Sequence, residues 1–194
     1  MPSPSTPSTR RTLIDAARTE LAEHGHAGVG LRAVARRAGV SHAAPAHFFG
    51  DRSGLLTAVA VEGFADLSAD LETVDEAAPA ARVAALGRAY VAFGDRHPAL
   101  MELMFRGAEL HGDDPDLRAA RERAIDPLIA AVAQSGSEDV QQTALISWAL
   151  VHGLVVLSRE GVIVALADPG ADGLTIANGL VDRFVADLFR PVDQ

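Results

Sequence analysis

The chain has 194 residues, of which 48% are hydrophobic and none is cysteine. This length can bury the core of one large or two small domains, and the lack of cysteine excludes a disulfide framework and cysteine-based metal or redox sites. The net charge of −9 is unevenly distributed: residues 1–60 carry seven arginines and four acids, whereas the remainder carries ten arginines and 22 acids. A basic end that can meet phosphates, joined to an acidic body, suits a protein that binds nucleic acid.

The first predicted helix follows an N-terminal arm. Residues 1–9 are rich in proline, serine and threonine and are predicted to be disordered. A helix is predicted over Thr9–His24, because apolar residues recur there at three- and four-residue steps, and Gly25 suits its end. Arg10 and Arg11 open this helix. The sequence leaves two interpretations of this pair: a contact with DNA phosphates or the minor groove, or two solvated side chains. Both arginines are included in the predicted DNA-binding residues.

Residues 31–49 have the pattern of a helix-turn-helix. The apolar spacing of Leu31–Ala38 predicts a helix, a turn follows at Gly39–Ser41, and His42–Phe49 forms the second element. Ser41 is predicted to cap this second helix, whose small residues allow a close approach to the major groove, while the two phenylalanines at its end are assigned to the core. Phosphate contacts are predicted for Arg32 and Arg36, and groove contacts for Ser41, His42, Ala43, Ala44 and His47.

A long helix is predicted after Gly50, with Asp51 as its N-cap, reaching about Leu71. Arg52 lies in its first turn, where the helix dipole favours acidic residues. A phosphate contact would explain this arginine, and a tolerated surface position is the alternative. We favour the contact.

The following helices are predicted over Pro79–Arg96 and Pro98–Phe105, and a further one begins at Pro115 with Asp114 as its N-cap. The short helix that ends at Phe105 is rich in methionine, which suits a pocket that repacks around different ligands as well as an ordinary core. The candidate pocket residues from this region are Tyr90, Met101, Met104 and Phe105.

A helix over about 138–159 is apolar on nearly all sides, which is typical of a helix shared between a core and a dimer interface. Trp148 and His152 lie four residues apart on one face, either as packed core residues or as a pocket wall with a polar anchor. A last helix follows Asp172 as its N-cap and has a wide apolar stripe for a partner helix. The predicted dimer contacts on these two helices are Ala149, Gly153, Val156, Leu180, Phe184 and Leu188.

Several motifs occur in the order in which a known family has them. They are Leu13-Ile14-Asp15-Ala16-Ala17 and Ala22-Glu23-His24-Gly25 in the first helix, Leu31-x-x-Val34-Ala35-x-x-Ala38-Gly39-Val40-Ser41 in the helix-turn, and Phe49-x-x-Arg52-x-x-Leu55 before the long helix. With these motifs, residues 10–56 resemble the DNA-binding domain of the TetR family of bacterial repressors. Trp148-Ala149-Leu150-Val151-His152-Gly153 resembles the signature of a C-terminal Trp-His-Gly subclass of that family.

The resemblance implies an all-α fold of about nine helices: a three-helix helix-turn-helix domain over 10–56, and a ligand-binding and dimerisation domain over 57–190. It also implies a homodimer formed by the last two helices, and a small-molecule pocket whose occupancy lowers operator affinity. The chain departs from the family at Gly30, where many members have serine or threonine, and at Pro45-Ala46, where many have Leu-Tyr. The missing tyrosine removes a common phosphate contact.

The sequence shows no phosphate-cradling glycine-rich turn, no HExxH motif and no nucleophile elbow, so it indicates no enzyme, metal site or cofactor. The N-terminus lacks an apolar signal segment, and polar residues interrupt the uncharged run 140–158, so we expect a cytoplasmic protein without a membrane span. The predicted function is a ligand-responsive transcriptional repressor that binds double-stranded operator DNA and is released by a small hydrophobic effector. The alternative is a helical ligand-binding or adaptor protein without sequence-specific DNA binding.

Overall fold

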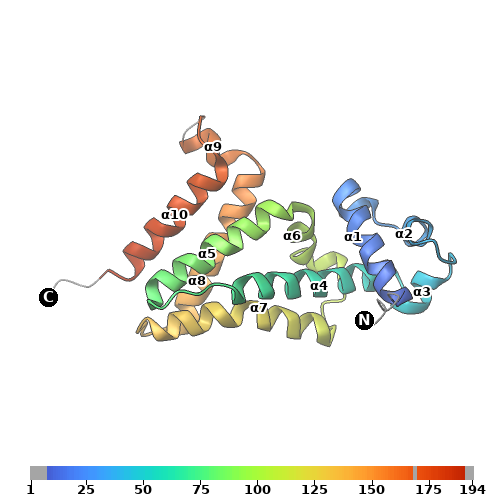
Figure 1. Ribbon diagram of the computed structural model, residues 1–194, viewed down its shortest axis with the longest axis horizontal. Coiled ribbons are helices and arrows are strands. Elements are labelled where there is room, and N and C mark those ends of the chain that lie inside the picture. Colours follow the sequence, from blue (N-terminus) through green and yellow to red (C-terminus); the bar gives the residue numbers. More distant parts are fainter. Residues whose placement is uncertain (1–7, 168–169, 191–194) are drawn as a thin grey trace, which may run out of the picture. The chain divides into compact units, whose positions relative to one another are not determined.

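A computed structural model describes residues 8–167 and 170–190 of the chain, and every regular element in these ranges is helical. This confirms the predicted all-α fold, with ten α-helices and one short 3-10 helix among the described residues instead of about nine helices (Figure 1). The elements are α1 (Thr9–Gly28), α2 (Leu31–Ala38), α3 (Ala44–Phe49), α4 (Arg52–Glu72), α5 (Pro79–Arg96), α6 (Pro98–Met104), η1 (Gly107–Glu109), α7 (Pro115–Gln134), α8 (Val140–Arg159), α9 (Val162–Ala167) and α10 (Gly173–Leu188).

The described chain divides into two compact units that differ from the expected boundary at residue 56. Unit 1 consists of the described part of Met1–Phe64 together with Ala99–Arg121, and unit 2 consists of Ala65–Pro98 and the described part of Glu122–Gln194. The helix-turn-helix segment therefore shares its unit with residues far along the sequence, most of α6 and all of η1 among them.

Glycines with positive φ interrupt the first helix of unit 1 and end the second. Gly25 has φ 68° and ψ 175°, so α1 is broken at its predicted end, but a further helical turn continues to Gly28. Gly39 ends α2 in the left-handed conformation with φ 67°, where a β-carbon would be strained. Gly30 precedes α2 and supplies no capping hydrogen bond from a side chain.

Helix α3 begins later than predicted. The sequence predicts Ser41 as its cap, but the helix starts at Ala44 with Ala43 as its N-cap. The cause is Pro45, which has no N–H to donate to the Ser41 carbonyl, as a helix capped by Ser41 would require. Instead the N–H of Ala44 donates to that carbonyl at 3.0 Å, and the proline lies in the first turn, where no donor is needed.

Helix α4 begins as the sequence predicts. Asp51 accepts a hydrogen bond from the N–H of Gly54 at 2.8 Å. Within unit 1, α4 meets α6 closely at Gly63, where a β-carbon would lie 2.9 Å from both Leu100 Cδ1 and Met104 Sδ. The lack of a side chain at this glycine is therefore what permits the close packing of the two helices.

Unit 2 is built on α5, α8 and α10, which pack against one another (Figure 1). Two glycines of α5 permit the close approach: a β-carbon on Gly87 would lie 2.8 Å from Val181, and one on Gly94 would lie 2.6 Å from Val155. The predicted N-cap of the last helix is confirmed, because Asp172 accepts the N–H of Thr175 at 2.9 Å. The six-residue helix α9 is an element that the sequence does not predict.

Helix α8 is buried on one side only. Ala144, Ser147 and Val151 are buried, whereas Leu145 is 58% exposed and Ile146 is 48% exposed. Among the described residues, α8 is also the one helix whose length and composition would permit a membrane span, a property that core helices of soluble proteins share. The other side of α8 is therefore apolar and exposed in the single chain.

Candidate functional site

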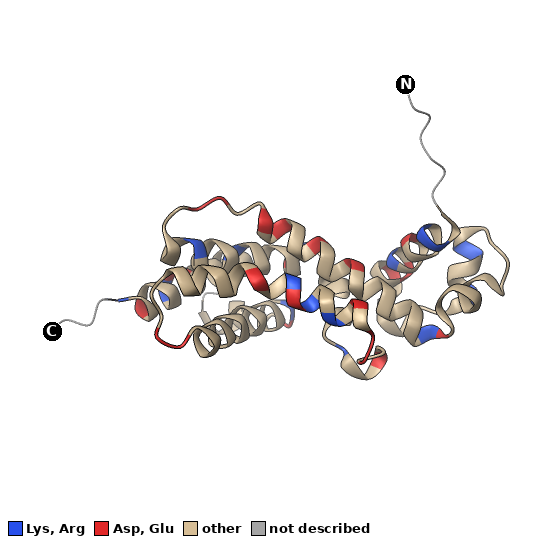
Figure 2. Cartoon of the chain, turned by 90° about the horizontal axis from the view of Figure 1, so that it is seen from below, with Lys and Arg blue, Asp and Glu red and all other residues tan. Residues whose placement is uncertain are grey.

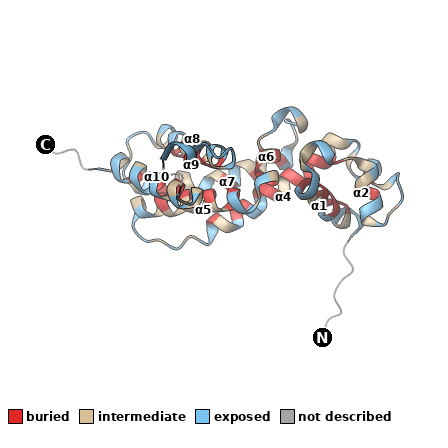
Figure 3. Ribbon diagram, turned by 90° about the horizontal axis from the view of Figure 1, so that it is seen from above, coloured by how far each residue is buried: buried red, intermediate tan, exposed pale blue. Residues whose placement is uncertain are grey.

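Helix α3 and the turn before it present small and imidazole side chains to solvent. Ser41, His42, Ala43 and His47 are exposed and Ala44 is half-buried, so the residues predicted to face the groove lie on an accessible surface (Figure 3). The prediction that Phe48 belongs to the core is wrong: its side chain is 41% exposed. Its ring lies edge-on to that of His47, with 5.2 Å between the ring centroids.

The three arginines of α2 divide into two classes. Arg37 is bound to α1, since its Nε donates to Glu20 at 2.7 Å and its terminal nitrogens donate to Glu23. The hydrogen bond from Arg37 lowers the pKa of the Glu20 carboxyl, so this pair remains charged at neutral pH. Arg32 and Arg36 are exposed and form no ion pair with the described part of the chain. The guanidinium groups of these two arginines are therefore exposed and not neutralised by a described carboxylate.

The arginines of α1 have protein partners. The guanidinium of Arg10 lies over the ring of Phe49 at 5.4 Å from its centroid, beside the end of α3. Arg11 pairs with Asp15 at 2.8 Å and with Glu62 at 3.2 Å. Acidic residues lie beside the basic ones along α1 (Figure 2). An arginine in this helix is therefore not always available to bind DNA.

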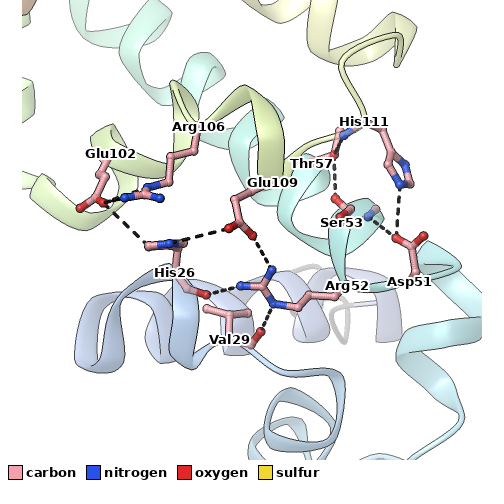
Figure 4. Close-up of polar contacts among 11 residues, drawn as sticks. His26, Val29, Asp51, Arg52, Ser53, Thr57, Glu102, Arg106, Glu109 and His111 are labelled. Carbon is pink, nitrogen blue, oxygen red and sulfur yellow. Dashed lines mark hydrogen bonds and ion pairs between the residues drawn. The ribbon is translucent and has the colours of Figure 1, made fainter.

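The guanidinium of Arg52 makes three hydrogen bonds within unit 1 (Figure 4). Its Nε donates to the carbonyl of Val29 at 2.8 Å, one terminal nitrogen donates to Glu109 at 2.6 Å, and the other donates to the carbonyl of His26 at 2.6 Å. The phosphate contact predicted for Arg52 has to compete with these three bonds. No local pattern indicates the bond to Glu109, because that residue is 57 positions away.

The predicted pocket residues are divided between the two compact units. Tyr90, Trp148 and His152 meet in unit 2, whereas Met101, Met104 and Phe105 belong to unit 1. Met104 is fully buried against α4 at Gly63, and Phe105 lies edge-on to Phe64 with centroids 5.5 Å apart. Met104 and Phe105 therefore pack against α4 within unit 1.

The three residues in unit 2 form a polar cluster between α5 and α8. The indole N–H of Trp148 donates to the hydroxyl of Tyr90 at 3.3 Å, and that hydroxyl lies 3.0 Å from Nδ1 of His152. Burial raises the pKa of Tyr90, so its hydroxyl remains protonated and can donate to the imidazole. Burial also lowers the pKa of His152 below the ordinary value of 6.5, which favours the neutral ring.

This cluster predicts a pH dependence of stability. Because the folded-state pKa of His152 lies below 6.5, the unfolded chain takes up the proton first as the pH falls. The stabilising contribution is therefore fully present above about pH 6.5 and is lost as the pH falls below that value and through the lower folded-state pKa. Urea unfolding at pH 8 and pH 5.5 should show a smaller loss of stability for His152→Asn than for the wild type. Equal losses in the two proteins would refute the assignment.

The predicted dimer residues lie on helices with apolar exposed sides. Ala149, Val156 and Leu180 are exposed, and Gly153, Phe184 and Leu188 are half-buried. Other apolar side chains on these helices are exposed as well, although they are not among the predicted dimer residues. Apart from Phe48, every large apolar side chain that the described residues expose lies on α8, α9 or α10: Leu145, Ile146, Val156, Leu157, Val162, Leu166 and Leu180.

Comparison with known proteins agrees with both halves of the chain. Residues 13–59 match the model of bacterial regulatory proteins of the tetR family, and residues 83–182 match that of the tetracyclin repressor-like C-terminal domain. An uncharacterized HTH-type transcriptional regulator of Mycobacterium tuberculosis is 28% identical over 160 residues, covering 80% of this chain and 72% of that protein.

Solved structures show the same fold. A protein of unknown function from Rhodococcus sp. RHA1 is 33% identical, with a TM-score of 0.81 over 94% of this chain and 96% of that one. The regulator FadR from Bacillus subtilis, solved in complex with stearoyl-CoA, is 16% identical, with a TM-score of 0.65 over 91% of this chain and 97% of that one. Because the C-terminal match alone spans more than half of the sequence, the chain belongs to the TetR family of DNA-binding transcriptional regulators.

Proposed function

We propose that this regulator is a repressor that binds operator DNA as a homodimer and leaves it when a small hydrophobic molecule binds the C-terminal part of the chain. The proposed DNA-binding surface is the exposed side of α2 and α3. On this side Arg32 and Arg36 form no ion pair with a described acid, and they lie near exposed small residues. This surface combines donors for phosphates with side chains short enough to let a helix enter the major groove.

The proposal divides the contacts into two kinds. Arg10, Arg32 and Arg36 hold phosphates and set the register of the protein on the duplex, but they read no bases. Base edges are read from the α3 side, where His42 and His47 supply the longest polar side chains. The groove-facing set is Ser41, His42, Ala43, Ala44 and His47. Two such surfaces in a dimer require half-sites on one face of the DNA, about 34–36 Å apart or a multiple of that distance.

We assign the dimer contact to α8 and α10. TetR-family regulators act as dimers, and the exposed apolar side chains of the described chain gather on α8 to α10. Between Val140 and Ser158 the sequence has no aspartate, glutamate or arginine, so an exposed side of α8 offers a second copy an uncharged surface. A patch of this kind marks an interaction site in a soluble protein.

The effector is proposed to be mainly apolar, with a group that can hydrogen-bond. The support is the polar cluster of Tyr90, Trp148 and His152 among the apolar side chains of α5 and α8. FadR of Bacillus subtilis shares the fold and was solved with stearoyl-CoA, a ligand whose acyl chain is apolar. An effector that binds the DNA-free conformation more tightly shifts the population away from the operator. This activity places the protein in the cytoplasm, where DNA is accessible.

Electrophoretic retardation on the DNA upstream of the gene tests the function. We expect a shifted complex whose affinity falls steeply between about 50 and 200 mM salt, because phosphate contacts release counterions. A fragment of equal length from within the coding sequence is the control for nonspecific binding. No shift on any promoter-proximal fragment at low salt would support the adaptor alternative instead.

A further inference from the structure

The end of α6 and the segment after it are fastened to the helix-turn-helix within unit 1. Figure 4 shows side chains from residues 102–111 meeting His26 near the end of α1 and residues at the start of α4. These parts are more than fifty residues apart in sequence. Polar contacts join them in addition to the apolar packing of α6 on α4.

Arg52 is the centre of this connection. Its guanidinium bonds two backbone carbonyls, those of His26 and Val29, and one carboxylate, that of Glu109. The side chain of Arg52 is 35% exposed and that of Glu109 is 30% exposed, so solvent only partly screens the pair. The hydrogen bond from Arg52 is the largest cause that lowers the pKa of Glu109, which keeps the pair ionised.

The two carbonyls belong to the corner between α1 and α2, residues 26–30. Val29 is almost completely buried, and Gly30 gives α2 no side-chain cap. A corner without a cap has fewer local bonds to fix its path. The fork of Arg52 supplies bonds at both of its ends, and the carboxylate of Glu109 holds that fork in place. The direction in which α2 and then α3 leave the corner depends on this arrangement.

Further contacts join the same parts. The N–H of His111 donates to the hydroxyl of Thr57 at 2.9 Å, and Nε2 of His111 lies 3.3 Å from Asp51. The imidazole of His26 lies between two carboxylates, 3.8 Å from Glu102 and 3.9 Å from Glu109. Glu109 thus contacts both the corner and the start of α4.

We infer that Glu109 is a positioning residue for DNA binding: through Arg52 it fixes the corner that carries α2 and α3, without touching DNA itself. The inference rests on the proposed DNA-binding surface, and it adds a residue outside the helix-turn-helix to the set on which operator affinity depends.

Simple electrostatics predicts the opposite effect of removing this carboxylate. Glu109→Gln deletes a negative charge from the unit that meets DNA, and charge alone would strengthen binding to phosphates. The positioning role predicts weaker binding instead, since the Arg52 fork loses its charged partner and the corner loosens. The sign of the change therefore separates the two explanations.

Fluorescence anisotropy on the operator fragment tests the inference. We expect Glu109→Gln to bind about tenfold more weakly than the wild type, as is typical for loss of one hydrogen bond between charged groups. The slope of log affinity against log salt should stay unchanged, because no phosphate contact is lost. Asp113→Asn is the matched control, an exposed acid in the same unit with the same charge change, and should bind as tightly as the wild type or slightly more tightly.

Arg52→Lys provides the second variant. It keeps the positive charge but lacks the planar fork that reaches three acceptors at once, so it should lose about the same factor of ten. The double variant should bind no more weakly than either single variant, because the two residues act as one unit. If Arg52 served mainly as a phosphate contact, Arg52→Lys would retain most of its affinity and Glu109→Gln would gain affinity, and the inference would fail.

Hydrogen exchange measures the local stability of the corner in the absence of DNA. Backbone amides of residues 26–34 should exchange faster in Glu109→Gln than in the wild type or in Asp113→Asn, while those of α5 stay unchanged. Unchanged exchange at the corner, together with wild-type affinity, would overturn the inference. A wild-type protein that binds no operator would instead contradict the proposed function, and the exchange result would still decide the role of Glu109 at the corner.

Discussion

Leu145→Glu is expected to convert the dimer into a monomer and to weaken operator binding by about 10²- to 10⁴-fold. Leu145 is 58% exposed on the apolar side of α8, and the side chains three to four residues further along that side are also exposed or half-buried. A carboxylate at this position would be buried between two apolar helices without a partner, which costs several kcal/mol. Binding then loses the effective concentration that links two reading surfaces on one DNA.

Two measurements check this prediction. Sedimentation velocity should give the mass of one chain for Leu145→Glu and of two chains for the wild type, and anisotropy on the full operator should show the loss of affinity. Ala81→Glu introduces the same charge at an exposed position of α5 and should remain a dimer. A Leu145→Glu protein that is still a dimer would show that α8 does not form the contact.

The fold is predictable where neighbouring residues determine it. Asp51, Asp114 and Asp172 cap their helices as predicted, because an N-cap bonds an amide only a few residues further on. The four-residue spacing of Trp148 and His152 also indicates one face correctly. Their common partner Tyr90 comes from a different helix, so the sequence suggests it only as a separate polar point.

The candidate site is less predictable, because acidic residues far away in the sequence determine which of its arginines form ion pairs. The helix dipole alone suggests a phosphate contact for Arg52, and a carboxylate 57 residues away provides the competing partner. Helix spacing puts Arg36 and Arg37 on the same side of α2, yet only Arg37 meets the acids of α1. The wrong N-cap of α3 has a local cause, since Pro45 delays the start of the helix by two residues. The short apolar run of α9 has no helical period long enough to detect.

The double substitution Arg32→Ala, Arg36→Ala is expected to lower operator affinity by roughly 10²-fold at moderate salt. A dimer presents each arginine twice, so four phosphate contacts are lost. At roughly 0.7 kcal/mol each, within the range of a net hydrogen bond, they account for that factor. The plot of log affinity against log salt should flatten by about 3.6, since each phosphate contact contributes about 0.9 to the slope.

Retardation on the operator and on single-base variants of it, at several salt concentrations, separates the roles of these residues. Phosphate contacts carry no sequence information, so the ranking of the variant operators should be the same with and without the two arginines. Arg123→Ala removes an exposed positive charge from unit 2 and should leave both the slope and the affinity unchanged. An altered ranking of operators would mean that α2 reads bases, and an unchanged slope would mean that the exposed side of α2 does not face the DNA.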